Sequence, residues 1–433
     1  MTEKEKPGSF AEDFDTMIKI MMWNSLGFFF LDFLIPVFAR DSLNASGTQV
    51  GLLISVLTLG ILLSSPLAGY IVDKTESKKK LVFIGGVGRG TSYFVIFISI
   101  IVLSLPGLMV GMFILGFSAG FFWIPYNTLV AQKSRKENRA YAYGKKDLMS
   151  GIGLFVGGII GFSMYGISLA FSTENVFLVY GAIPIFGISN IISSFVFLRK
   201  VDESKRVDLE LEELGKMSGS NDESITIVSG KRKKRANLGK KHLTIGIVFL
   251  FSVVILSAIN DTLVKPFLNI YVLENINDNE LFAMAAYIPA GIASMIFAPR
   301  IGKLVDKIHP VVGVSITSIL GAVITWVLIN TTSIFGFSAL LLIDVTIAKV
   351  AGLVVQNLVS RISRGNRGKM MGGHMVMQNL GLMIGPIFGG LAWDNLGQTI
   401  PFIISIFVEL SLIPFYWAAV KNITGNMEEE VEK

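Results

Sequence analysis

Two aspartates lie inside long apolar stretches, where a charged side chain is costly and is therefore expected to have a function. Asp32 is surrounded within one helical turn by uncharged residues, and Asp344 is followed five residues later by Lys349, which lies on another side of a helix. An ionisable group at the bilayer centre costs at least about 2.5–3.5 kcal/mol. Each aspartate is therefore predicted to bind a proton or a substrate in a cavity, with a bridge to another helix as the alternative.

Further polar side chains occur in other apolar stretches. Asp261 and Lys265 are four residues apart, the spacing of an ion pair on one helical face, and that pair is either structural or part of a coupling site. Arg89, within GVGRGT, is expected to meet an anionic substrate or a structural carboxylate. His374 and Gln378 share a face and either line a pathway or are simply hydrogen-bonded.

The composition excludes several classes of protein. Charged residues make up 16% of the 433 residues, against about 25% in an average soluble domain. There is no cysteine, and the three histidines are scattered, so neither a metal cluster nor a cysteine nucleophile is expected. The sequence therefore predicts an integral membrane protein that is not an enzyme and needs no cofactor.

The apolar stretches set the elements that must position these side chains. A spanning helix needs about 20 apolar residues, and twelve such stretches occur between charge clusters and Gly, Pro or Asn breaks. They are residues 16–38, 49–72, 81–104, 106–131, 147–170, 176–198, 243–272, 280–301, 311–330, 334–358, 370–393 and 398–420. Residues 199–241 are charged and read as a linker between two six-helix bundles, 1–198 and 242–433.

The two halves repeat each other. A constant offset of 228 residues separates Asn138-Arg139 from Asn366-Arg367, and the glycine run that begins at Gly153 from the run that begins at Gly381. Asp32 before Pro36 in the first stretch also matches Asp261 before Pro266 in the seventh. Such a tandem repeat indicates duplication of a six-helix unit, and two parallel halves around a midplane site are a transporter architecture.

Lysine and arginine predict the orientation, because short loops rich in them stay in the cytoplasm. The loops after spans two, four, eight and ten and the linker are basic, whereas the opposite loops hold one clear basic residue, Arg40, beside acids such as Glu274 and Asp394. Both termini are therefore predicted to be cytoplasmic, in a plasma-membrane protein. The net charge of +6 is then explained by topology and by contact with anionic lipid, without nucleic acid.

A motif at the exit of span two recurs at the exit of span eight. The first copy contains Gly69, Asp73, Lys74 and Lys78, with Glu76 where glycine is usual; the second contains Gly302, Asp306 and Lys307 before His309-Pro310 breaks the pattern. In these residues the sequence resembles the major facilitator superfamily, whose fold is two six-helix bundles of membrane-spanning helices. The resemblance implies that Asp73, and more weakly Asp306, tethers neighbouring helices as a conformational latch. From the residues alone, Gly69 is expected to permit close helix approach, and the lysines also fit a topology signal.

These observations together predict an all-α membrane protein that works as a secondary active transporter. It is expected to move a small-molecule substrate by alternating access, coupled to protons, as a monomer in lipid. An uncoupled facilitator and a non-transporting receptor or sensor on the same scaffold are the alternatives. The intact, duplicated latch motif favours transport, because a sensor needs no cycling gate.

Overall fold

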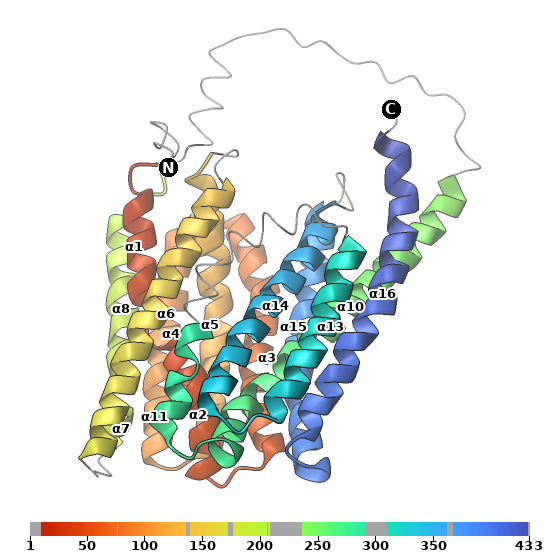
Figure 1. Cartoon of the computed structure of the whole chain (residues 1–433). Coiled ribbons are helices and arrows are strands. Elements are labelled where there is room, and N and C mark those ends of the chain that lie inside the picture. The colour runs from red at the N-terminus through yellow and green to blue at the C-terminus, as the bar shows by residue number, and fades with distance from the viewer. Residues whose placement is uncertain are drawn as a thin grey trace, which may run out of the picture. The chain divides into compact units, whose positions relative to one another are not determined.

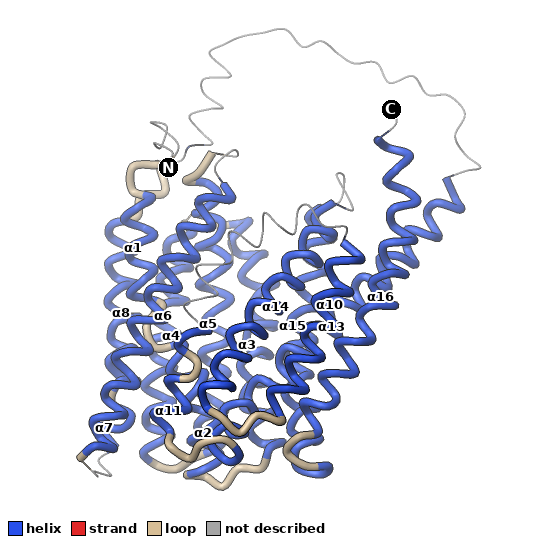
Figure 2. The backbone as a smooth tube through the Cα atoms, viewed as in Figure 1, coloured by secondary structure: helices blue, strands red, loops and turns tan. Residues whose placement is uncertain are grey.

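Helices make up nearly all of the described chain in the computed structural model (Figure 2). The structure describes residues 10–75, 77–135, 139–171, 176–205, 207, 236–290, 310–361 and 367–431. In lipid every backbone N–H and C=O must be satisfied within the protein, which helices achieve along their own length. The fold class predicted from the sequence, an all-α membrane protein, is confirmed.

Eight helices are found among the described residues before the predicted linker, with the labels of Figure 1. They are α1 (Phe14–Asn24), α2 (Phe28–Asp41), α3 (Gly47–Lys74), α4 (Lys78–Ile101), α5 (Leu105–Gln132), α6 (Arg139–Ala170), α7 (Val176–Tyr180) and α8 (Ala182–Lys200). Six described helices follow it: α10 (Ala236–Asn275), α11 (Glu280–Ala285), α13 (Pro310–Ile329), α14 (Ile334–Arg361), α15 (Arg367–Leu396) and α16 (Ile400–Val431).

The chain divides into two compact units. The first contains Met1–Leu34 and Leu59–Ser229, and the second contains Ile35–Thr58 and Gly230–Lys433. Residues 35–58, which the sequence assigns to the N-terminal bundle, thus group with the second unit. The helix α3 contributes its first half to one unit and its second half to the other.

Ten of the described helices are long and apolar enough to cross a membrane. They match ten of the twelve predicted spans. The first predicted span, 16–38, is instead two shorter helices, α1 and α2, and residues 291–301 of the eighth, 280–301, lie outside the described residues. The prediction of one continuous first helix is therefore wrong.

The first span breaks because of Gly27. Its φ is +88°, a conformation that side-chain-bearing residues rarely adopt, and a Cβ there would lie 2.4 Å from the ring of Phe186. The seventh span, its counterpart in the repeat, has Leu256 at the corresponding place and continues as one helix through α10. A glycine in one copy and a leucine in the other thus explain the difference.

Two other boundaries differ from the sequence prediction. The sixth span, 176–198, consists of the short helix α7 and the longer α8, with Gly181 between them, where a Cβ would lie 2.0 Å from the carbonyl oxygen of Phe177. The helix α10 begins at Ala236, inside the predicted linker. The remaining linker residues from 208 to 235 lie outside the described residues.

Each unit has its own apolar core. In the first, α1, α5 and α8 pack through large side chains that include Phe14, Phe122 and Phe197. In the second, α10, α13, α14 and α16 meet around residues such as Leu250 and Tyr416. Aromatic side chains bring much contact area into such cores.

Glycines bring equivalent helices close together in both repeats. Along α6, a Cβ at Gly153 would lie 2.2 Å from the carbonyl oxygen of Met22 on α1. Along α15, a Cβ at Gly389 would lie 2.1 Å from the carbonyl oxygen of Leu263 on α10. Small residues permit such close approach of helix backbones in membranes, so these glycines allow the paired helices to pack closely.

Candidate functional site

Three helices of the second unit that are long and apolar enough to cross a membrane bring ionisable groups near one another. Asp261 lies on α10, Asp344 on α14 and Glu409 on α16. The charge of Asp344 acts on both Asp261 and Glu409, and the charges of Lys265 and Lys349 act on Asp261. We call Asp261, Lys265, Asp344, Lys349 and Glu409 the acidic cluster.

The members of the acidic cluster differ in exposure. Asp261, Lys265 and Lys349 are exposed, whereas Asp344 and Glu409 are half-buried. Asp261 and Lys265 lie together as the four-residue spacing predicts, since the charge of one acts on the other. Their roles as a structural pair or a coupling site remain predictions.

Sequence reasoning did not single out Glu409. Its carboxylate accepts a hydrogen bond from the amide nitrogen of Asn260 on α10 at 3.2 Å. It also lies against Gly321 of α13, where a Cβ would be 2.7 Å from Oε2. The signal was present in the sequence, because Glu409 is an acidic residue inside the apolar twelfth span.

The other predicted membrane residues are placed as follows. Asp32 lies half-buried on α2 in the first unit, so neither unit contains both Asp32 and Asp344. His374 is half-buried and Gln378 exposed on α15. The prediction that these two line a pathway is not tested by their positions.

Arg89 binds the end of the broken first span. Its Nη1 donates to Oδ1 of Asn24 at 2.5 Å and its Nη2 to the Asn24 backbone carbonyl at 3.3 Å. The guanidinium also lies 4.9 Å from the ring centre of Phe122 and 5.8 Å from that of Trp123. The Arg89 side chain is buried, and among the described residues no carboxylate lies within ion-pair distance of it.

This geometry gives Arg89 a structural explanation that the sequence did not offer. The carbonyls at a helix C-terminus carry partial negative charge and lack partners within the helix. Aromatic faces attract a cation as well. At the break after α1, Arg89 therefore contacts the oxygens of Asn24 and the faces of two aromatic rings. The partners that the sequence suggested for Arg89 were an anionic substrate or a carboxylate.

Asp394 caps α3 within the second unit. Its carboxylate accepts hydrogen bonds from Gly47 N at 2.7 Å, Thr48 N at 2.8 Å and Thr48 Oγ1 at 2.6 Å. The helices α3 and α15 meet closely along this contact, because a Cβ at Gly51 would lie 2.1 Å from the carbonyl oxygen of Pro386. A carboxylate at a helix N-terminus satisfies free N–H groups and the positive end of the helix dipole.

A second contact of the second unit joins α2 and α10. Arg40 forms an ion pair with Glu274 at 3.2 Å and donates to the carbonyl of Ala45 at 3.3 Å. Gln398 donates to the same carboxylate. Glu274 and Asp394, which the sequence places on the external side, therefore both make contacts between helices.

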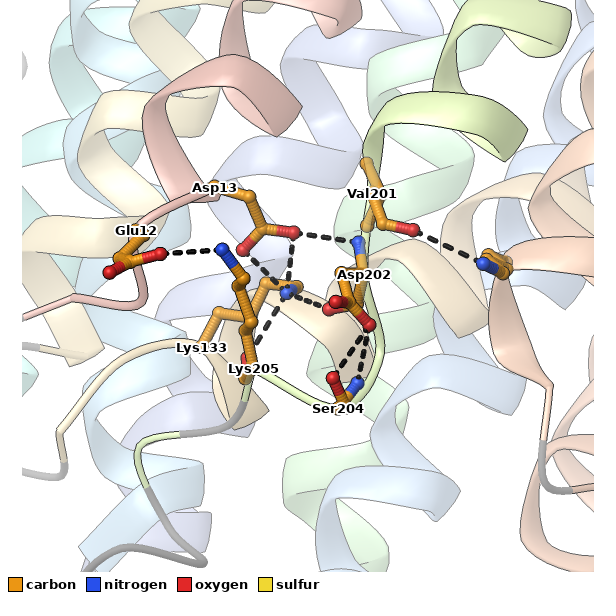
Figure 3. Close-up of polar contacts among 8 residues, drawn as sticks. Glu12, Asp13, Lys133, Val201, Asp202, Ser204 and Lys205 are labelled. Carbon is orange, nitrogen blue, oxygen red and sulfur yellow. Dashed lines mark hydrogen bonds and ion pairs between the residues drawn. The ribbon is translucent and has the colours of Figure 1, made fainter.

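A buried lysine ties together three segments of the first unit (Figure 3). The Lys133 Nζ lies 2.6 and 2.8 Å from the two carboxylate oxygens of Asp13 and donates to the carbonyl oxygens of Asp202 at 2.6 Å and Lys205 at 3.1 Å. Asp202 N donates to Asp13 as well, at 2.8 Å. We call Glu12, Asp13, Lys133, Asp202, Ser204 and Lys205 the Lys133 cluster.

Two exposed residues of the Lys133 cluster, Asp202 and Lys205, have shifted pKa values. Hydrogen bonds from the backbone and the hydroxyl of Ser204 lower the pKa of Asp202 below its ordinary value. The hydrogen bond to Glu12 raises the pKa of Lys205. Nearby, Glu203 accepts from the backbone N–H of Lys79 and so caps the start of α4. The first residues of the predicted linker are thus fixed on the first unit.

Comparison with known proteins identifies the family. The family model for the Major Facilitator Superfamily matches residues 20–353 and 250–430. The chain belongs to the Major Facilitator Superfamily. No curated protein matches the sequence significantly.

Solved structures of other superfamily transporters share the fold. A bacterial homolog of the human lysosomal transporter Spinster, in an inward-facing and unoccupied conformation, has a TM-score of 0.70 at 13% identity, over 98% of this chain and 99% of that chain. The nucleoside transporter NupG has 0.68 at 14%, over 94% and 99%. Tetrameric PepTSo2 has 0.65 at 14%, over 96% of each chain. This superfamily member is a multi-pass membrane transporter.

The superfamily motif is described in its first copy. Asp73 is exposed near the end of α3, and its side chain makes no hydrogen bond or ion pair with the described residues. Lys74 donates to the hydroxyl of Tyr70 and lies 4.3 Å from its ring centre, and Lys78 begins α4. Among the described residues, a Cβ at Gly69 would meet nothing within 4 Å, so the predicted close approach is not seen there.

The second copy of the motif cannot be compared. Gly302, Asp306 and Lys307 lie outside the described residues. The latch role of both copies therefore stays a prediction from the superfamily resemblance.

Proposed function

We propose that this superfamily member is a proton-coupled secondary active transporter that moves a small solute by alternating access. The observation that carries the proposal is the acidic cluster, which gathers carboxyl groups from α10, α14 and α16 at membrane depth. Carboxyl groups in such places are expensive and mark ion and proton pathways. Asp344 is the member that acts on both other acids, and Asp32 of the first unit is a second candidate for proton or substrate binding.

The proposal includes the orientation that the basic loops predict. Both termini and the linker are cytoplasmic in the plasma membrane, and the protein works as a monomer in lipid. In this orientation Asp394 and the Arg40–Glu274 ion pair lie at the external face. Their contacts, which hold α3 and α2 to α15 and α10, then help to close that face during one half of the cycle.

A proteoliposome experiment tests the proposal. A panel of amino acids, short peptides, nucleosides and sugars is offered with and without an imposed pH gradient. Accumulation above equilibrium of at least one solute with the gradient, and mere equilibration without it, is the expected result. If a solute only equilibrates, whether or not the pH gradient is imposed, the protein is an uncoupled facilitator instead. If no solute moves, the result favours the receptor or sensor.

The matched variants follow from the positions of the acids. Asp344→Asn and Asp32→Asn keep the side-chain shape and remove the titratable group. Loss of gradient-driven accumulation in either variant, with exchange at equal pH retained, is expected of a proton-coupling residue. Full accumulation in the double variant would exclude both as the coupling group.

A further inference from the structure

The carboxyl group of Glu409 occupies a tightly fitted place between three helices. Its two oxygens lie 2.7 and 2.9 Å from the point where a Cβ on Gly321 would be, so the glycine of α13 makes room for it. The opposite contact is Asn260 of α10, whose side chain is 8% exposed and whose Nδ2 donates to Oε1 at 3.2 Å. The fit indicates that this carboxyl group is held in a defined position.

Two buried oxygens at this place lack a donor. Glu409 Oε2 and Asn260 Oδ1 are both shielded from solvent, and neither accepts a hydrogen bond from the described residues. Buried polar atoms are nearly always hydrogen-bonded, so such a pair needs an explanation. An ionised carboxylate accepts only, whereas a protonated one supplies an O–H donor. A proton on Glu409 is therefore the donor that this pair of residues lacks.

The charges around Glu409 favour that proton. The groups whose charges act on it are Asp344 of α14 and Asp261 of α10, both acidic. The helix α13, which packs on α16, contains no ionisable residue. Lys265 and Lys349, by contrast, act on Asp261. Carboxyl groups that lie close together in a half-buried place repel one another when they are ionised, and a proton on one of them relieves that repulsion.

Asn260 can bind either form of the carboxyl group. With Glu409 ionised, the amide nitrogen donates to it, as in the structure. Rotation of the amide by half a turn brings Oδ1 to the carboxyl group, where it accepts a hydrogen bond from the O–H of protonated Glu409. The amide oxygen and nitrogen are similar in size, so the same space holds both arrangements.

We propose that Glu409 is a proton-binding residue of the transport cycle and that Asn260 positions its carboxyl group in both protonation states. Loading converts the carboxylate and a hydronium ion into a carboxylic acid and water, and release reverses this step. The inference rests on the proposed proton-coupled function and adds a residue of the twelfth span to it.

Infrared spectroscopy of the purified protein in lipid tests proton binding without any solute. A protonated carboxyl group has a C=O stretching band that a carboxylate lacks. We expect such a band near neutral pH in the wild type and its loss in Glu409→Gln. The matched control is Glu274→Gln, which changes an exposed glutamate in an ion pair at the end of α10 and should leave the band unchanged.

Two further variants separate positioning from mere folding. Asn260→Leu removes the hydrogen-bonding amide, so the band should shift in frequency while remaining present. Glu409→Asp keeps a carboxyl group but draws it back from the amide, and should shift the band in the same sense. A band that persists unchanged in Glu409→Gln would overturn the assignment, and an unshifted band in Asn260→Leu would overturn the role of Asn260.

Transport measurements keep this inference distinct from the proposed function. The probe is the panel solute that the wild type accumulates most strongly under a pH gradient. Glu409→Gln should reduce its accumulation to the level reached without a gradient and retain exchange at equal pH. Undiminished accumulation in Glu409→Gln would refute the role of Glu409 alone. If the wild type did not respond to the gradient, the proposed proton-coupled function itself would be refuted.

Discussion

Replacement of Lys133 by methionine is expected to loosen one end of the first unit severely. The side chain of Lys133 is fully buried, that of its partner Asp13 is 10% exposed, and methionine fills similar space without the charge. The substitution leaves the Asp13 carboxylate without its cation and takes the donor from the carbonyls of Asp202 and Lys205. Buried groups left in this state are costly.

The size of the effect follows from the burial of the pair. Removal of one partner from a buried ion pair costs about 3–5 kcal/mol. The double variant Lys133→Met/Asp13→Leu should recover much of this loss, because it leaves neither charge unpaired. The matched control is Lys205→Met, which breaks an ion pair with Glu12 in which both side chains are exposed, 43% and 83%, and should change stability little.

Amide hydrogen exchange measured by mass spectrometry provides the assay. The Asp202 N–H donates to Asp13 at 2.8 Å, so its exchange reports on whether the cluster is closed. Since about 1.4 kcal/mol corresponds to a factor of ten, exchange in Lys133→Met should be at least about a hundred-fold faster. Equal exchange rates in Lys133→Met and Lys205→Met would refute the reasoning, because burial would then make no difference.

Three further predictions concern the contacts of the units. Gly389→Ala should destabilise the protein by about 1–3 kcal/mol, because the new Cβ would meet a carbonyl oxygen of α10 at 2.1 Å. The control is Gly69→Ala, where the new Cβ would have open space around it, and this variant should leave the thermal midpoint nearly unchanged. Asp394→Asn should weaken the cap on α3, and a faster reaction of a cysteine introduced at Thr48 with an impermeant maleimide would show it; an unchanged rate would contradict it. Hydrogen bonds from Ser204 lower the pKa of Asp202. The stabilisation that Asp202 contributes should therefore be complete above its unfolded-state pKa of about 3.9 and be lost as the pH falls through its lower folded-state pKa. In Ser204→Ala this loss should begin at higher pH, as measured by NMR titration of Asp202.

Much of the fold could be predicted from hydropathy and the repeat. Ten spans appear where apolar stretches predict them, because length and composition decide whether a helix can cross a membrane. Hydropathy could not predict the break in the first span, because the mean hydropathy of a window of about 20 residues does not register a single residue such as Gly27. The close packing of Phe186, which comes from a distant part of the chain, leaves no room for a side chain at Gly27, and hydropathy does not register that contact.

The candidate site was predicted in part. Asp261, Lys265 and Asp344 could be found as charges inside apolar stretches, and the structure brings them together. Their association with Glu409 and Asn260 could not, because helices α10, α14 and α16 are far apart in the sequence and helical periodicity says nothing of which helices meet. For Arg89 the sequence offered an anionic substrate or a carboxylate as partner. The structure adds the amide and carbonyl oxygens of Asn24, and the anionic substrate stays a prediction.

The cap of α3 by Asp394 has a consequence for the synthesis of the protein. The backbone N–H of Gly47 donates to the carboxylate of Asp394, which lies 347 residues later in the chain and is synthesised later. At about 5–20 residues per second, the ribosome needs roughly 20–70 s to make that residue after it has made the start of α3. During this interval the first turn of a newly inserted helix must bind water or lipid headgroups. A nascent chain that ends before Asp394 therefore has no side chain to cap the start of α3, and the cap is complete only once the eleventh span has been made.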